Sequence, residues 1–510
     1  MTWTSVHVRL SWAAADVDAF IADVLAPELD GHRAAGRVGD WFYVRYWEQG
    51  PHLRVRARDA AVDLAAALRA LVERTDHPVR EVSADWLPHG DVREAPYVPE
   101  VARYGGPAAL PVAEDVFCRS TEVAVAVLRS GASKFTAAVE LVMATTVALG
   151  MDRVEAASWL RALATGWRQA HEPVAPPGVS SHLAARTVHE ARAPHLAARW
   201  DRLEAHATGA VAYWVEQVRS ARLPRHAWAS QLHMLCNRLG LDPEEERTAC
   251  RLVAMTAEAP DGPTGFHEDG AAAPDRRYLA ASKFHPGVPG QGPREVAATP
   301  STSSWWPDVT LPRAAPVPGG LADALLTRRT ARGADLAGSL DAGQLATLLW
   351  TAQGALPDGR RPYPSAGARH SARLRVVAWR VSGLEPGVYD VDEARRTLLR
   401  VAASPPVDDV RAASMWFGDG EDRVDPATTP ALLALYARVG VLRKAYGLRA
   451  LRLAFAEAGH LAQNLALVAA STGLALGVIG GFYDDVAHDV LCLDGVDDVL
   501  VYLMPLAGAR

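Results

Sequence analysis

The chain has 510 residues, a formal net charge of -6, 49% hydrophobic residues and 22% charged residues. Its length predicts two or more domains, and its composition is that of a soluble globular enzyme rather than a disordered protein. The negative net charge argues against a general affinity for nucleic acid or for anionic membranes.

Several common kinds of segment and site are missing from the sequence. Residues 1–12 lack the charged and apolar regions of a signal peptide, and the longest apolar tract, residues 461–482, is interrupted by polar residues and glycines. The four cysteines form no CxxC pair, and there is no HExxH, no GxxxxGK[ST] and no GxGxxG after a strand. We therefore predict a cytoplasmic protein with no metal site, no disulfide framework and no membrane span.

A predicted hairpin at residues 41–58 is the most informative stretch of the first half. Two alternating strands flank a QGP turn, which is typical hairpin chemistry. Basic side chains share one face of the second strand: His52, Arg54, Arg56 and Arg58. A solvated basic edge strand explains this pattern, and so does a carboxylate site, because guanidinium groups bind carboxylates bidentately.

The rest of the first half is predicted to be mostly helical. The apolar spacing predicts a strand at residues 5–10 and helical segments at residues 16–29, 61–75, 111–219 and 227–257. Glu100 and Arg103 lie in a turn-rich segment, and His233 lies in an apolar helix. Taken singly, a surface ion pair and a core histidine explain these residues without any function.

Composition changes after residue 257, where the chain becomes rich in Pro, Gly, Ala and Ser. We predict a first domain at residues 1–257, a linker or wrapping arm at 258–310 and a second domain at 311–510. The second domain alternates strands with helices at residues 321–330, 341–353 and 436–471. The expected fold is α+β in two domains, the first mostly helical.

The first half contains three separated motifs, in the order WFYVRYWEQGPHLRVR, YVPEVARYGG and LHMLCNRLG. Together they resemble the glutamate-elimination domain of lantibiotic dehydratases, in the free-standing form called the thiopeptide-type bacteriocin biosynthesis domain. That family removes glutamate from glutamylated Ser or Thr of a precursor peptide and leaves dehydroalanine or dehydrobutyrine. The resemblance implies catalytic roles for Arg54, Arg56, Glu100, Arg103 and His233.

These residue types suit a β-elimination. Arginines bind the glutamyl carboxylates and stabilise developing negative charge, and a histidine exchanges protons near neutral pH. Glu100 is either a base or the residue that orients Arg103, and we favour the second role. A separate glutamyl-tRNA-dependent subunit is needed to attach the glutamate. Pyridine synthases of thiopeptide pathways are related to this domain, so a cyclase that joins two dehydroalanines stays open as an alternative.

The second half carries the motifs RRTAR, YPSAGARH, LEPGVYDVD, EAGHLAQNLAL and IGGFYDD. It resembles the SagB-type dehydrogenases, a nitroreductase-like FMN family with an α+β fold that oxidises azolines to azoles in ribosomal peptides. The resemblance implies an FMN site formed by Arg328, Arg329, Thr330, Arg332, Pro364, Ser365, Gly367, Asn464, Gly480 and Gly481.

The sequence departs from this family at one place. Azoline dehydrogenases often carry an adjacent Lys-Tyr pair as their catalytic couple, whereas here Tyr446 follows Ala445 and the lysine is Lys444. A shift by one position rotates a side chain about 100° around a helix. Lys444 and Tyr446 are the candidates for this couple.

The order of the two halves resembles the bifunctional enzymes of lactazole-type thiopeptide pathways. We expect one polypeptide that acts twice on a glutamylated, azoline-bearing precursor peptide, since tethering raises the local concentration of both activities. Nitroreductase-like domains usually build the flavin site across a two-fold axis, so a homodimer is expected. A non-catalytic peptide-binding scaffold with a degenerate flavin domain is a second alternative.

Overall fold

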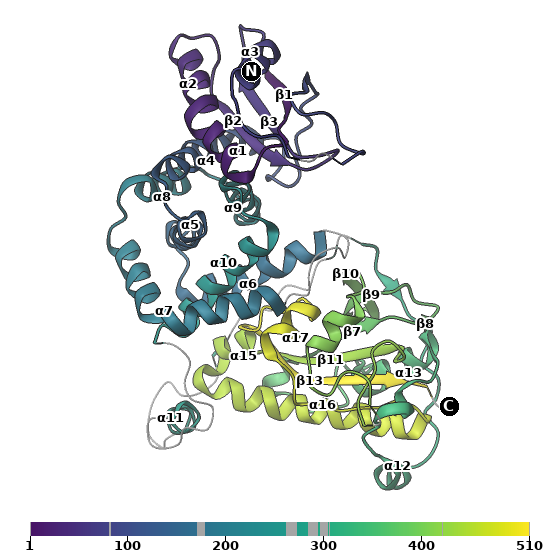
Figure 1. Cartoon of the computed structure of the whole chain (residues 1–510). Coiled ribbons are helices and arrows are strands. Elements are labelled where there is room, and N and C mark those ends of the chain that lie inside the picture. Colours follow the sequence, from purple (N-terminus) through teal and green to yellow (C-terminus); the bar gives the residue numbers. More distant parts are fainter. Residues whose placement is uncertain are drawn as a thin grey trace. The chain divides into compact units, whose positions relative to one another are not determined.

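The computed structural model describes residues 2–80, 83–170, 179–261, 273–283, 294–295, 304, 306–420 and 422–508. The chain forms two compact units, one of residues 1–157 and 184–262 and the other of residues 158–183 and 263–510 (Figure 1). The first unit is mostly helical with a small sheet, and the second is built on a larger sheet flanked by helices. The predicted fold class is confirmed, while the predicted boundaries at residues 257 and 310 stay predictions.

A four-stranded antiparallel sheet opens the first unit, in the order β2-β3-β1-β4. Its strands are β1 (Trp3–Arg9), β2 (Trp41–Tyr46), β3 (His52–Arg58) and β4 (Val92–Glu94). The predicted hairpin is therefore β2 and β3, and its register places Phe42 opposite Arg56 and Val44 opposite Arg54. Arg45 is opposite Leu53, so it belongs to the other face.

One face of this sheet buries an apolar core. Val6, Val8, Leu53 and Val55 pack there against helices near the N-terminus. Those helices are α1 (Ala14–Ala19), the π-helical turn η1 (Phe20–Leu25), α2 (Ala26–Ala34) and α3 (Leu64–Glu73). The Asp63 side chain caps α3 by accepting the N–H of Ala66.

Seven longer helices complete the first half of the chain. They are α4 (Leu110–Ser130), α5 (Lys134–Ala148), α6 (Arg153–Ala170), α7 (Val179–Ala205), α8 (Gly209–Ser220), α9 (Arg225–Leu239) and α10 (Pro243–Glu258). Local signals explain their ends: α9 stops at Gly240, whose φ is 81°, and α10 starts in a capping box of Asp242 and Glu245. Helix α4 packs on α9, and both helices contact β2 on the second face of the sheet.

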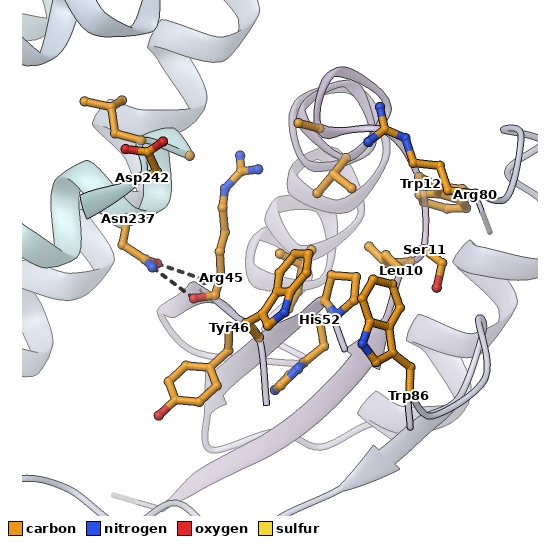
Figure 2. A pocket seen from close by; sticks show the side chains of 17 residues that line it. Leu10, Ser11, Trp12, Arg45, Tyr46, His52, Arg80, Trp86, Asn237 and Asp242 are labelled. Carbon is orange, nitrogen blue, oxygen red and sulfur yellow. Dashed lines mark hydrogen bonds between the residues drawn. The ribbon is translucent and has the colours of Figure 1, made fainter. Parts of the chain in front are cut away.

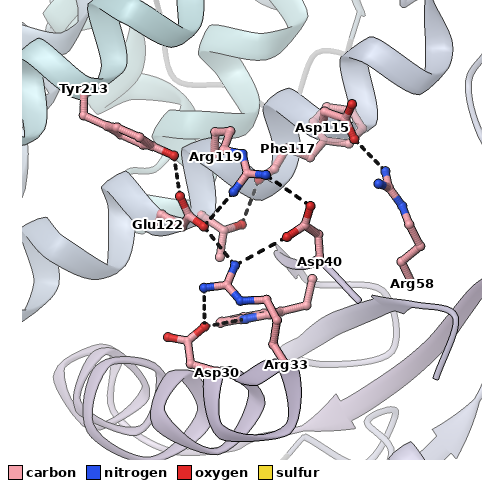
Figure 3. Close-up of polar contacts among 11 residues, drawn as sticks. Asp30, Arg33, Asp40, Arg58, Asp115, Phe117, Arg119, Glu122 and Tyr213 are labelled. Carbon is pink, nitrogen blue, oxygen red and sulfur yellow. Dashed lines mark hydrogen bonds and ion pairs between the residues drawn. The ribbon is translucent and has the colours of Figure 1, made fainter. Parts of the chain in front are cut away.

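Ion pairs fix the small sheet to α4 (Figure 3). Arg33 of α2 lies 2.9 Å from Glu122 of α4, and Arg119 of α4 lies 3.2 Å from Asp40 beside β2. Arg58 at the end of β3 lies 2.8 Å from Asp115 of α4. The last basic residue of the hairpin therefore has a structural partner.

The second unit contains a seven-stranded antiparallel sheet in the order β12-β13-β11-β7-β9-β10-β5. Its strands are β5 (Val309–Thr310), β7 (Ala372–Ala378), β9 (Gly387–Asp392), β10 (Thr397–Ala402), β11 (Ala431–Arg438), β12 (Ala475–Leu476) and β13 (Asp498–Ala507). Helices α13 (Ala342–Gln353) and α16 (Ala450–Thr472) share one core with this sheet, and α14 (Val407–Ala412) and α17 (Asp484–Leu491) share another. A short parallel pair, β6 (Leu340–Asp341) and β8 (Val381–Ser382), lies apart from it.

One expectation about the second half needs correction. Tyr436 lies in buried strand β11, where its hydroxyl donates to Asp390, so the predicted helix at residues 436–471 is wrong at its start. That helical region is instead α15 (Val439–Tyr446), the short turn η4 (Gly447–Arg449) and α16. The predicted linker contains a helix, α11 (Pro274–Ala281), and most of its other residues lie outside the described part of the chain.

Among the described residues, no helix is long and apolar enough to cross a membrane. The same part of the chain holds no group of three or more His, Cys, Asp or Glu side chains arranged for a metal ion.

Candidate functional site

Arg54 and Arg56 lie side by side on the face of β3 that is turned away from the apolar core of the first sheet. The Arg54 guanidinium stacks 3.4 Å above the Tyr46 ring and lies 3.0 Å from Glu48, whose side chain is 69% exposed. Arg56 lies 4.5 Å from the Tyr97 ring centroid, and its Nε donates weakly to Ser5 Oγ at 3.4 Å. An exposed ion pair is worth little, so both guanidinium groups keep most of their capacity for an anionic ligand.

Two histidines beside these arginines are neutral at pH 7. His7 is the cross-strand partner of Arg54, and His52 Nε2 accepts a hydrogen bond from Arg54 Nε at 3.2 Å. Burial, together with the nearby Arg54, Arg56 and Arg9, lowers the pKa of His7 to about 4. Burial and the charge of Arg9 also lower the pKa of His52 to about 4. The positive charge of this face therefore comes from its arginines.

The pair Glu100 and Arg103 lies on the segment that covers this face. Arg103 Nη1 is 2.8 Å from Glu100 Oε2, and its Nε donates to Ser230 Oγ of α9 at 3.0 Å. The segment turns at Gly105, whose φ is +95° and where a Cβ would lie 2.7 Å from Pro224. Glycine therefore lets the loop lie against the start of α9, which holds Arg103 in place.

His233 lies on α9 one helical turn after Ser230 and faces α10. Its Nδ1 is 2.8 Å from Glu246 Oε2, and Glu246 is 2% exposed. The carboxylate favours the tautomer with the proton on Nδ1, which leaves Nε2 as the basic nitrogen. Sequence reasoning missed Glu246, because it sits among three glutamates that begin α10 and such residues are usually helix-capping charges.

The structure brings Arg54, Arg56, Glu100 and Arg103 to one place, and helix α9 connects His233 to them through Ser230. Tyr104 is 5% exposed, and the charges of Arg103, Arg56 and Glu100 are near enough to influence the pKa of its hydroxyl. Arg54 in turn adjoins Arg56. Ser230, which binds Arg103, is three residues from His233 on the same helix. Two further basic residues of the hairpin are set apart, since Arg58 pairs with Asp115 and Arg45 pairs with Asp18 on the other face.

A cavity of about 540 Å³ adjoins this face at the hairpin turn (Figure 2). Trp12, Trp86 and Tyr46 line it together with Arg45 and Arg80. The Tyr46 ring therefore belongs both to this cavity and to the stacked pair with Arg54.

Asn237 positions the edge strand beside this cavity. Its side-chain amide accepts the Arg45 N–H at 2.9 Å and donates to the Arg45 carbonyl at 2.9 Å, as the dashed lines of Figure 2 show. A side chain of α9 thus hydrogen-bonds β2 along its outer edge, much as a neighbouring strand would.

In the second unit, part of the predicted cofactor site surrounds a cavity of about 220 Å³. Thr330, Arg332 and Gly480 line this cavity with Trp416. Arg329 instead lines a separate cavity of about 360 Å³ and lies 2.6 Å from Asp335. Arg332 has no ion-pair partner within the described residues, so its charge is available to a phosphate.

The other predicted cofactor residues form a second group near α16. Ser365 donates to Glu457 at 2.8 Å, and this buried carboxylate also accepts from Ser371 and from the N–H of Ala372. Asn464 donates to the Pro362 carbonyl at 3.1 Å, which holds the same loop. Glu457 therefore shapes the loop that carries Pro364, Ser365 and Gly367.

Tyr446 and Lys444 have different surroundings on α15. The Tyr446 hydroxyl lies against Gly367, whose φ is +56° and whose missing Cβ leaves room for it. Lys444 is exposed, and the intervening Ala445 is buried. The structure thus joins Tyr446, but not Lys444, to the glycine loop.

These residues suit a phosphorylated planar cofactor. Arg328 and Arg332 have no ion pair among the described residues, and Gly480 offers backbone without a side chain beside the same cavity as Arg332. At Gly481 a Cβ would lie 2.8 Å from the Trp416 indole nitrogen, so this position also needs glycine. Cations with free hydrogen-bonding capacity next to open backbone match a phosphate and a flat ring.

Two family models match the chain. One is described as the lantibiotic biosynthesis dehydratase C-terminal family and matches residues 3–257, which are 255 of 510 residues. The other is the nitroreductase family and matches residues 325–508. A protein of Methanocaldococcus jannaschii described as a nitroreductase is 29% identical over 187 residues, which cover 36% of this chain and 89% of that protein.

Two solved structures of proteins that modify peptides are also similar to parts of this chain, with TM-scores below 0.5. The pyridine synthase of thiomuracin biosynthesis is 20% identical, with a TM-score of 0.37, over 51% of this chain and 98% of that one. The tRNA-dependent lantibiotic dehydratase of Microbispora sp. 107891 is 23% identical, with a TM-score of 0.29, over 50% of this chain and 28% of that one. At such TM-scores, the family assignment depends on the sequence matches.

Proposed function

Because the chain belongs to the lantibiotic dehydratase C-terminal family and carries a nitroreductase-family domain after it, we propose that it is a bifunctional enzyme of ribosomal peptide maturation. Its first half eliminates glutamate from glutamylated Ser or Thr of a precursor peptide. Its second half oxidises azolines of the same peptide to azoles. The observation that carries the first assignment is the pair of arginines, Arg54 and Arg56, on a face whose histidines are neutral.

In the elimination, Arg54, Arg56 and Arg103 bind the carboxylate groups of the glutamyl ester. A base removes the α-proton of the esterified residue, the C–H electrons form the Cα=Cβ double bond, and the Cβ–O bond breaks. Glutamate leaves as a carboxylate with the electrons of that bond. The guanidinium groups favour this step because the negative charge on the departing oxygen exceeds that of the ester.

His233 is the base that we assign to this step. Its Nδ1 contact with buried Glu246 presents Nε2 as the proton acceptor and stabilises the imidazolium that forms. Glu100 is 61% exposed and pairs with Arg103, which supports an orienting role rather than the role of a base.

In the second half, bound FMN would supply the hydride-accepting chemistry that the oxidation of an azoline needs, and a residue of this chain would take the proton. Arg328, Thr330 and Arg332 would hold the phosphate end, and Gly480 and Gly481 would lie along the flavin. Tyr446, which contacts Gly367, is the better candidate for the proton-handling group than exposed Lys444. A homodimer would bring the two groups of cofactor residues together around one flavin.

The proposal implies partners of defined chemistry. The substrate is a glutamylated, azoline-bearing precursor peptide, and a separate glutamyl-tRNA-dependent subunit attaches the glutamate. The aromatic cavity that shares Tyr46 with the arginines offers room for peptide residues flanking the esterified one.

Mass spectrometry of a peptide with one glutamylated serine and one thiazoline tests both halves. Loss of glutamate reports the elimination, and loss of two hydrogens with added FMN reports the oxidation. A second peptide, which carries two dehydroalanines, tests the cyclase alternative. Ring formation in that peptide, with no release of glutamate from the glutamylated one, would replace the first assignment by a cyclase. A purified protein that is colourless and gains no flavin absorbance with FMN would refute the second assignment.

A further inference from the structure

Arg238 is a buried guanidinium with neither a hydrogen-bond nor an ion-pair partner among the described residues. It lies in the last turn of α9, is 0% exposed, and ranks among the largest fully buried side chains of the described residues. Its Nε, Nη1 and Nη2 have no hydrogen-bond partner within the described part of the chain. Other buried arginines have polar partners at their terminal nitrogens: Arg375 donates to the carbonyls of Leu491 and Cys492, and Arg247 pairs with Glu244.

The surroundings of Arg238 are aromatic, and they include the elimination site. Its guanidinium carbon lies 5.3 Å from the Phe117 ring centroid and 5.7 Å from that of Phe42. The Arg56 guanidinium lies 5.4 Å from the same Phe42 ring. Burial, with a smaller contribution from the charge of Arg56, lowers the pKa of Arg238 to about 10. Arg238 therefore stays protonated at neutral pH.

Packing does not explain why an arginine stands here. The contacts that lock the end of α9 to β2 use the Arg238 carbonyl, which accepts from the Tyr43 hydroxyl at 2.8 Å and from Arg45 Nε at 3.1 Å. Any residue at this position would supply that carbonyl. A buried charge without a counter-ion destabilises the fold, and an apolar side chain of similar volume would remove that cost.

We propose that Arg238 is a positioning residue of the elimination site, whose charge holds the carboxylate of the glutamyl group against Arg56 without touching it. The proposal rests on the proposed elimination of glutamate. A positive charge beside Phe42 raises the electrostatic potential at Arg56, which contacts the same ring, and the low polarity around both groups strengthens this effect. The unpaired charge is retained because the anionic substrate is its counter-charge.

Two variants of the full-length protein test this idea, Arg238→Met and Arg238→Lys. Arg238→Met removes the charge but keeps most of the side-chain volume. We therefore expect kcat/KM for glutamate release to fall about 30-fold, mainly through a higher KM, because one charge that acts on the substrate through space is lost. Its Tm is expected to equal or exceed that of the wild type, because a buried charge has gone. Arg238→Lys keeps the charge and should retain kcat/KM to within about fivefold.

The azoline oxidation of the second half serves as an internal control and should be unchanged in both variants. Wild-type elimination by Arg238→Met would overturn the inference while the proposed function stands. An activity loss accompanied by a Tm drop of more than about 5 °C, or an equal loss in Arg238→Lys, would also overturn it, because a structural role would then suffice. Failure of the wild-type protein to release glutamate would overturn the proposed function, and the inference with it.

Discussion

Replacing Glu246 with Gln should separate the geometry of the His233 contact from its charge. The amide has the same shape and can still accept the Nδ1 hydrogen that the carboxylate accepts at 2.8 Å. It cannot stabilise the imidazolium that forms when His233 takes the α-proton. The variant therefore tests whether His233 acts as the base.

The size of the effect follows from the burial of the pair. With charge centres about 4 Å apart and an effective dielectric constant of about 20, the attraction is about 4 kcal/mol. The His233 side chain is 17% exposed, and the amide keeps a neutral hydrogen bond worth about 1 kcal/mol, so about 2–3 kcal/mol of transition-state stabilisation is lost. This loss corresponds to a decrease of about 30- to 150-fold in the elimination rate.

Single-turnover release of glutamate from a glutamylated peptide measures that rate without interference from product release. Glu244→Gln is the matched control, since it makes the same substitution on the same helix at a residue that contacts Arg247, at 3.2 Å, rather than His233. We expect the control to react at the wild-type rate. A wild-type rate in Glu246→Gln would refute the assignment of His233 as the base.

Three further predictions follow from other contacts. Between pH 6.5 and about 4, the native state binds fewer protons at His52 than the unfolded chain does, because the pKa of His52 is lowered in the native state. The free energy of unfolding should therefore fall by up to about 2 kcal/mol as pH drops through this window. Urea unfolding of His52→Gln should show a smaller fall. Arg332→Ala should weaken FMN binding about tenfold more than Arg329→Ala in an absorbance titration, because Arg329 is held by Asp335; equal losses would contradict the assigned phosphate site. Asn237→Ala leaves the Arg45 N–H and carbonyl without their amide partner. Urea unfolding should therefore show a free energy of unfolding lower by about 2 kcal/mol. A decrease below about 0.5 kcal/mol would be inconsistent with this contact.

Local patterns were enough to predict many elements of the fold. The alternation around the QGP turn predicted β2 and β3, and Asp341 before an apolar run predicted α13, where it forms a capping box with Gln344. Tyr436 was misjudged because the strand ALLALYAR is rich in leucine and alanine, which favour helices in isolation. Pairing on both sides with β7 and β13 overrides that preference.

Residues whose importance lies in long-range contacts escaped the sequence patterns. Glu246 reads as one of several acidic residues at a helix start, and only the packing of α10 on α9 reveals its contact with His233. Asn237 and Arg238 lie in a recognisable motif, but their surroundings differ. Asn237 contacts an edge strand and Arg238 lies among aromatic rings, and both environments depend on the docking of α9 onto β2.

The sequence by itself determined the two-part α+β organisation, the hairpin that carries Arg54 and Arg56, and the family of each half, because short-range periodicity and contiguous motifs encode these features. Only the tertiary structure decided which basic residues remain available. Docking of α4 and α1 gives Arg58 and Arg45 carboxylate partners, while Arg56 is left beside Tyr97 and a buried, unpaired Arg238. The physical reason is that a charge is neutralised by what lies near it in space, and residues far apart along the chain provide those neighbours.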